Sequence, residues 1–172
     1  MAVREIITAP DSRLKTVSEP VKTVDGDTRA LMDDMLETMY AARGIGLAAI
    51  QVGVPKRIIV MDLAADGELP RPRYFVNPEI LWRSDETRPH EEGCLSVPDL
   101  YDTVERAAQV TVRFLDYSGQ KQEIEADEML AVCLQHEIDH LNGVLFIDYL
   151  SKLKRSMMLR KLQKAKRQKE PA

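Results

Sequence analysis

Apolar residues recur at helical spacing in three parts of the chain. In residues 28–42, side chains such as Met35 and Met39 fall on one stripe, which predicts an amphipathic helix. Residues 127–142 are apolar around almost the whole helix circumference, and we therefore expect a buried helix there. Residues 151–169 predict a third helix, which is polar enough to lie on the surface.

Between the first two helices, the pattern changes to that of strands. Residues 57–63 read as a short buried strand, and residues 73–83 read as extended chain that Pro78 breaks. Residues 104–117 mix β-branched and polar side chains and lead through a turn to residues 120–125, the partner in a hairpin. These elements predict an α+β fold, with small mixed or antiparallel sheets around the buried helix and a surface helix at the C-terminus.

Composition supports one domain in a reducing compartment. The chain has 172 residues, of which 44% are hydrophobic and 30% are charged, as in ordinary globular proteins. It has no apolar run of about 18 residues, no signal-peptide core at the start, and only two cysteines. We therefore expect a cytoplasmic protein with no membrane contact.

Charge divides the chain near residue 150. Residues 151–172 hold nine Lys and Arg and one acid, whereas the chain as a whole has a net charge of −4. We expect residues 1–150 to form the functional part and residues 151–172 to be a basic helix and tail of the same domain. A basic helix on an acidic body suggests an anionic partner, although a solvated helix face explains the charges equally well.

The stretch LQHEIDHLNG contains the strongest chemical signal. His136 and His140 are four apart, so a helix brings both rings to one side, where they can bind one metal ion. Glu137 stands beside that ion and is placed to act as general base. A coincidental pair of helix histidines is the alternative, and it is disfavoured because burying two unpaired imidazoles is costly.

A catalytic ion usually takes three protein ligands. Familiar peptidases of the HExxH type place the third ligand downstream, where one pattern requires a histidine and this chain has Phe146. The upstream candidates are the possible metal ligands in HEEGCLSVP, namely His90, Glu91, Glu92 and Cys94. Cys94 is the best of them, because a thiolate binds soft or borderline metals tightly, although a free cysteine is often only a small buried hydrophobe.

Three segments together resemble the signature motifs of bacterial peptide deformylases. They are GIGLAAIQ at 44–51, EGCLS at 92–96 and QHEIDH at 135–140. The resemblance implies hydrolytic removal of the formyl group from the N-terminal formyl-methionine of nascent polypeptides by a metal-bound hydroxide. It implies one divalent ion, Fe²⁺ first, with Zn²⁺, Ni²⁺ or Co²⁺ able to occupy the site, and we expect a monomer.

Carried over position by position, the resemblance assigns the central residues. Cys94, His136 and His140 would bind the metal, and Glu137 would act as general base and then general acid. The Gln51 amide and the Leu95 backbone N–H would stabilise the negative oxygen that forms on the substrate.

Substrate residues are predicted around the same centre. Extended substrate could pair with Gly46, and methionine needs an apolar slot, for which Ile45, Met129, Val132 and Cys133 are candidates. The slot residues share roughly one helix face, except for Ile45.

The resemblance also bears on the rim of the site. It implies that Glu92 lies at the substrate site and forms a buried pair with Arg106. Some relatives have an arginine where this chain has Tyr101, so substrate contacts at that rim differ.

Two other functions remain open from the sequence. One is a general HExxH metallopeptidase, which would cleave unformylated peptides. The other is a metal-stabilised module without activity, which would have four protein ligands and no open position. The basic segment 151–169 predicts a contact with ribosomal RNA that weakens with salt.

Overall fold

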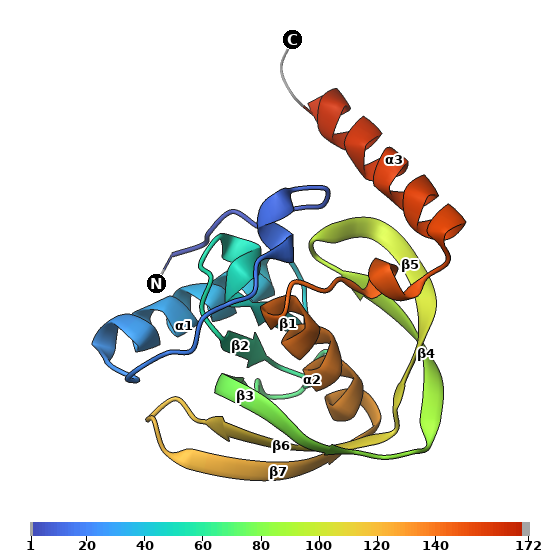
Figure 1. The fold of residues 1–172 in the computed structure, drawn as a ribbon. Coiled ribbons are helices and arrows are strands. Elements are labelled where there is room, and N and C mark those ends of the chain that lie inside the picture. Colours follow the sequence, from blue (N-terminus) through green and yellow to red (C-terminus); the bar gives the residue numbers. More distant parts are fainter. Residues whose placement is uncertain (1, 170–172) are drawn as a thin grey trace.

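The computed structural model describes residues 2–169 and has an α+β architecture, as predicted (Figure 1). Its helices are α1 (Gly26–Ala41), α2 (Glu128–Leu141) and α3 (Lys152–Lys169). Its strands are β1 (Gly46–Ala48), β2 (Ile58–Met61), β3 (Arg73–Arg83), β4 (Thr87–Cys94), β5 (Val97–Ala107), β6 (Gln109–Leu115) and β7 (Lys121–Asp127). Short 3-10 turns complete it, of which η2 (Ala49–Val52) and η3 (Phe146–Tyr149) matter for the site.

All three predicted helices are present, within two residues of the expected ends. Asp25 caps α1, since its carboxylate accepts a hydrogen bond of 2.9 Å from the backbone N–H of Thr28. Met32, Met35 and Met39 are fully buried beneath it. Asp127 stands at the start of α2 but makes no capping bond with its side chain.

Five strands form one antiparallel sheet in the order β1-β2-β3-β6-β7. The predicted break at Pro78 is wrong, because β3 continues through it with a shift in register between Val76 and Glu79. Asn77 takes a positive φ of 52° there, and its side-chain amide bonds to the backbone of Val21 in both directions at 2.8 Å. The proline is therefore accommodated as a bulge rather than as a strand end.

Strands β1 and β4 and most of β5 were not predicted. The glycine-rich stretch after α1 contains β1 at the edge of the large sheet, followed by the η2 turn. The segment around the HEEGCLSVP motif forms the β4–β5 hairpin, a separate two-stranded sheet. Burial alternates along β5, but charged residues such as Arg106 occupy some of its inward positions, so the sequence lacks the apolar alternation that marks a half-buried strand.

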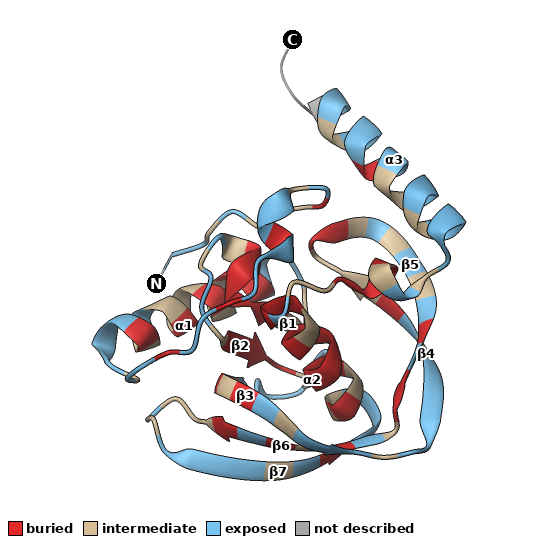
Figure 2. Ribbon diagram, viewed as in Figure 1, coloured by how far each residue is buried: buried red, intermediate tan, exposed pale blue. Residues whose placement is uncertain are grey.

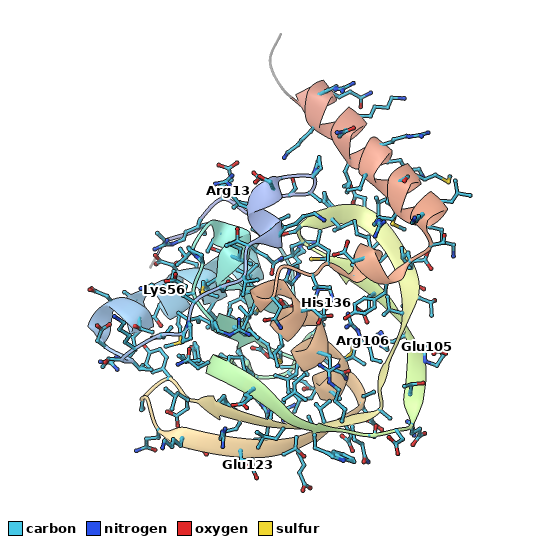
Figure 3. The ribbon with its side chains drawn as sticks, viewed as in Figure 1. Arg13, Lys56, Glu105, Arg106, Glu123 and His136 are labelled. Carbon is cyan, nitrogen blue, oxygen red and sulfur yellow. The ribbon has the colours of Figure 1, made fainter. Side chains whose placement is uncertain are left out.

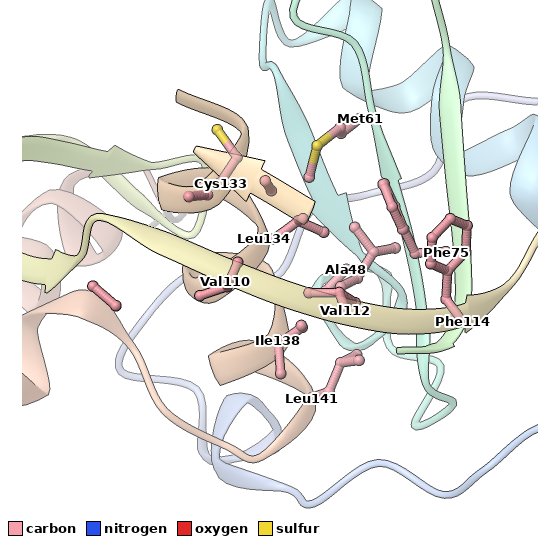
Figure 4. Close-up of a cluster of buried hydrophobic side chains, with 14 of the residues drawn as sticks. Ala48, Met61, Phe75, Val110, Val112, Phe114, Cys133, Leu134, Ile138 and Leu141 are labelled. Atoms are coloured by element: carbon pink, nitrogen blue, oxygen red, sulfur yellow. The ribbon is translucent and has the colours of Figure 1, made fainter. Parts of the chain in front are cut away.

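The core lies between α2 and the large sheet. Figure 4 shows Leu134, Ile138 and Leu141 of α2 facing Val112 and its neighbours on the sheet. The helix is buried around most of its circumference, as its sequence predicted, because the large sheet, the η2 turn and the β4–β5 hairpin pack around it (Figure 2). Polar groups on this helix are therefore held in a largely dry environment.

Helix α3 lies outside this core and is mostly exposed (Figure 2). It is nevertheless anchored, since Leu162 is buried and the Lys166 ammonium donates to the backbone carbonyl of Thr8 at 3.1 Å. Within residues 2–169, none of the helices combines the length and apolar character that a membrane span requires.

Candidate metal centre

Three donor atoms from two separate elements meet beside α2. The helix projects His136 and His140 to one side, and β4 ends with Cys94 opposite them. The Cys94 Sγ lies 3.2 Å from His140 Nε2, and the two Nε2 atoms lie 3.3 Å apart. All three atoms lie within 4.8 Å of one another, which is the spacing of ligands around a single ion.

The charges around these atoms fit a cation. Burial lowers the pKa of His136, but its contacts with Cys94 and Glu92 outweigh this and raise it well above its ordinary value. Burial and the charge of His136 hold the pKa of His140 well below its ordinary value. The anionic groups beside His136 therefore favour a positive charge on that side of the donor cluster, and a bound divalent ion would supply one.

A carboxylate fixes the orientation of one histidine. Glu92, on β4, is buried, and its Oε1 lies 2.9 Å from His136 Nδ1. A carboxylate can only accept, so Nδ1 carries a proton, and Nε2 is the ring nitrogen that faces the donor cluster and would give its lone pair to an ion bound there.

Behind Glu92 lies the arginine predicted from the resemblance. Arg106 donates to both Glu92 oxygens, at 2.7 and 2.8 Å, and both side chains are about 96% buried. Figure 3 shows Arg106 between α2 and the β4–β5 hairpin, near His136. Burial raises the pKa of Glu92, but the bonds from Arg106 and His136 outweigh it and lower the value to about 2. The carboxylate is therefore ionised.

Glu137 is buried beside the donor cluster. Among the described residues its Oε1 has no hydrogen-bond partner, and burial raises the pKa of the carboxyl to about 7. Its Oε2 packs against Gly46 so closely that an added Cβ there would lie 2.7 Å away. The glycine is thus required by the close approach of β1 to this side chain.

The amide of Gln51 is oriented toward the cysteine. Its Oε1 accepts from the backbone N–H of Ala48 at 2.9 Å, which leaves the amino group facing the other way. That group donates to Ser96 Oγ at 3.0 Å and lies 3.5 Å from Cys94 Sγ. Gln51 is buried.

A cavity of about 600 Å³ opens onto these groups. Every residue predicted to contact substrate lines it: Ile45, Gly46, Glu92, Met129, Val132 and Cys133. Leu95, in the turn between β4 and β5, lines it too. Burial raises the pKa of the Cys133 thiol to about 12, so this wall of the cavity is uncharged. Contact of these residues with substrate stays a prediction.

Tyr101 forms part of the rim, as expected from its position. It is paired with Gly93 across the hairpin, and its ring covers that glycine so closely that a Cβ would lie 2.3 Å from the ring. The ring is largely exposed, so it presents an aromatic surface to whatever enters the cavity.

Sequence reasoning missed several partners of the centre. Ser96 accepts from Gln51, and Asp139 and Tyr149 extend the network behind Arg106. Only Asp139 carried a signal, since it lies three residues after His136 on a buried helix where a charge needs a partner. The others are brought in by chain segments that no local pattern connects.

Comparisons with known proteins agree with this arrangement. A family model described as polypeptide deformylase matches residues 3–156. A peptide deformylase of Phenylobacterium zucineum is 65% identical over 164 residues, which cover 95% of this chain and 97% of the relative. Another from Hyphomonas neptunium is 64% identical over 167 residues, with 96% and 95% covered.

Solved structures agree as well. The crystal structure of peptide deformylase from Ehrlichia chaffeensis aligns with a TM-score of 0.93 at 46% identity, covering 97% of this chain and 98% of that one. A peptide deformylase structure from Legionella pneumophila aligns with a TM-score of 0.91 at 50% identity, covering 99% and 100%.

Proposed function

Because this chain belongs to the peptide deformylase family of metal-dependent hydrolases, we propose that it removes the formyl group from the N-terminal formyl-methionine of nascent polypeptides. One observation carries the proposal: a thiol and two imidazole nitrogens converge within 4.8 Å beside a buried glutamate and an open cavity. The reaction breaks the formyl C–N bond and adds water, releasing formate and a free N-terminal amine.

Cys94, His136 and His140 would hold the metal. The donor set of one sulfur and two nitrogens suits Fe²⁺, which the family resemblance favours, and also Zn²⁺, Ni²⁺ or Co²⁺. When bound, a divalent ion acts as a Lewis acid and lowers the pKa of water from about 15.7 to roughly 7. Three protein ligands leave a position open, which a catalytic site requires.

Glu137 would move the proton. It neighbours a ligand on α2, and its buried Oε1 is uncommitted among the described residues. It accepts a proton from the attacking water and then delivers it to the departing amine nitrogen. The wall formed by Gly46 on the other side holds the carboxylate in place.

Gln51 and Leu95 would stabilise the negative oxygen that develops on the formyl group. The Gln51 amino group already points toward the donor cluster, because Ala48 fixes the other end of the amide. The Leu95 N–H belongs to the residue directly after Cys94, in the turn beside the cavity. Losing one such donor typically costs about 10²–10³ in rate.

The peptide would bind along β1. This strand is at the edge of the large sheet, so its outer side can pair with an extended chain that enters beside Gly46. The methionine side chain then reaches the uncharged wall that α2 contributes through Val132 and Cys133.

The test is formate release from a formyl-methionyl tripeptide, with the unformylated tripeptide as control. Glu137→Gln is expected to retain the metal and to lose about 10²–10⁴ in kcat. An HExxH metallopeptidase is not favoured, because its third ligand would lie downstream. Cleavage of the unformylated peptide, with no formate released from the other, would establish it instead.

Other expectations stay predictions. They are the monomeric state, the cytoplasmic location, the division of the chain at residue 150, and a contact between the ribosome and residues 151–169. Helix α3 supports the last by exposing most of its basic side chains. The final residues, 170–172, lie outside the described part of the chain.

A further inference from the structure

A chain of five polar contacts leads from the surface to His136, one of the proposed metal ligands. Tyr149 donates its hydroxyl to Asp139 Oδ2 at 2.8 Å, and the same oxygen accepts from Arg106 Nη1 at 2.6 Å. Arg106 then bonds to Glu92 through two parallel contacts, and Glu92 lies 2.9 Å from His136 Nδ1. Each member is thus held by the one outside it.

Tyr149 closes this chain at the protein surface. It is the last residue of η3, in the segment that leads into α3. Its ring covers Arg106, with the guanidinium carbon 4.8 Å from the ring centroid. Because the side chain is 53% exposed, it contributes little to the core, and both its hydroxyl and its ring face the network.

We propose that Tyr149 and Asp139 are positioning residues for the metal centre, acting through Arg106 and Glu92 on the orientation of His136. The inference rests on the proposed metal centre but not on the reaction.

The effect can pass through Arg106 because its guanidinium donates to Asp139 on one side and to Glu92 on the other. With Nη1 held by Asp139, the guanidinium cannot rotate, so its other two N–H groups stay aligned with the Glu92 carboxylate. Tyr149 limits the rotation of Asp139 and keeps water from the guanidinium. If the contacts of Tyr149 and Asp139 are lost, Glu92 can move. The ring of His136 is then held less firmly in the orientation that directs Nε2 at the ion.

The test measures metal release, without turnover. Cobalt-loaded protein is mixed with excess EDTA, and the loss of the visible cobalt absorption is followed over time. Tyr149→Phe removes one hydroxyl and keeps the ring over Arg106. Tyr117→Phe is the matched control, because its hydroxyl donates to Asp33 at 3.1 Å on another part of the surface. Asp139→Asn keeps the shape of the side chain and removes its charge.

Tyr149→Phe should release cobalt about ten-fold faster than the wild type and Tyr117→Phe, and Asp139→Asn should approach a hundred-fold. In zinc-loaded protein, the Nδ1 proton of His136 should exchange with water faster in Tyr149→Phe than in the wild type. In Tyr117→Phe, its exchange rate should equal that of the wild type. If the role of Tyr149 were purely structural, Tyr149→Phe and Tyr117→Phe would lower the melting temperature alike. The exchange rate of the His136 Nδ1 proton would then stay at the wild-type value in both variants.

Two results would overturn different statements. Equal cobalt release from Tyr149→Phe and Tyr117→Phe would refute the positioning role. A wild-type protein that does not bind cobalt at all would refute the metal centre itself.

Discussion

The substitution Gly46→Ala tests how the position of the Glu137 carboxylate affects activity, because it leaves the carboxylate itself unchanged. An added Cβ would lie 2.7 Å from Glu137 Oε2, and ordinary contact begins near 3.4 Å, so one of the two must move by about 0.7 Å. The backbone of β1 is held by pairing with β2, whereas the glutamate side chain has torsional freedom. We therefore expect the carboxylate to shift away from β1.

The magnitude follows from how strictly proton transfer depends on geometry. A displacement of about 1 Å can cost 10²-fold, so a shift of this size should lower kcat by about 10- to 100-fold, or roughly 1.4–2.7 kcal/mol in the barrier. Stability should change by less than about 2 kcal/mol, because Gly46 has no positive φ and alanine is tolerated in a strand.

The assay is formate release over a range of peptide concentrations, together with urea unfolding and metal content. Gly26→Ala is the control, because an added Cβ at Gly26 meets nothing within 4 Å. A Gly46→Ala protein with the kcat of the wild type would refute the close contact as a determinant of the Glu137 position. A change in KM alone would also refute it, and would point to the substrate strand instead.

Other predictions concern stability and partners. Arg106→Leu strands the buried charge of Glu92 and should lower the free energy of unfolding by about 3–5 kcal/mol, measured with urea; a loss below 1 kcal/mol would contradict the buried pair. Burial raises the pKa of Asp62, but hydrogen bonds from a tyrosine and two backbone N–H groups outweigh it and lower the value. Its stabilisation is therefore complete above the ordinary pKa of about 3.9 and is lost as pH falls through the lowered one. Asp62→Asn should cost about 1–3 kcal/mol at pH 7 and less below pH 4, so an equal cost at both pH values would contradict this assignment. The double variant Lys161→Glu/Lys164→Glu, in exposed positions of α3, should reduce co-sedimentation with ribosomes at low salt without changing formate release; unchanged co-sedimentation would remove α3 as a ribosome contact.

The elements that were predicted well are those whose signal is local. The spacing of His136 and His140 predicts a shared side of α2, because a helix has a fixed number of residues per turn. The apolar circumference of α2 likewise predicted its burial, which the structure confirms. The three motifs identified the family, and the comparisons confirm it.

The predictions that failed depended on contacts between distant segments. Pro78 reads as a break, but Asn77 finds its partner in Val21, 56 residues away, and the strand continues as a bulge. In the β4–β5 hairpin, the charged residues Glu92 and Arg106 occupy buried positions among the apolar ones, so the sequence lacked the pattern of a strand. Its pairing becomes visible only when the register is known.

The sequence by itself determined the metal-binding helix, the α+β class and the family, because helix periodicity and short motifs are properties of neighbouring residues. Only the tertiary structure decided that Cys94 is the donor closest to the two histidines, that Gly46 contacts Glu137, and that Arg106 links Glu92 to Asp139. These contacts join residues 14 to 91 positions apart, and the packing of α2 between two sheets brings them together. Such distances depend on the folded path of the whole chain, which no local pattern encodes.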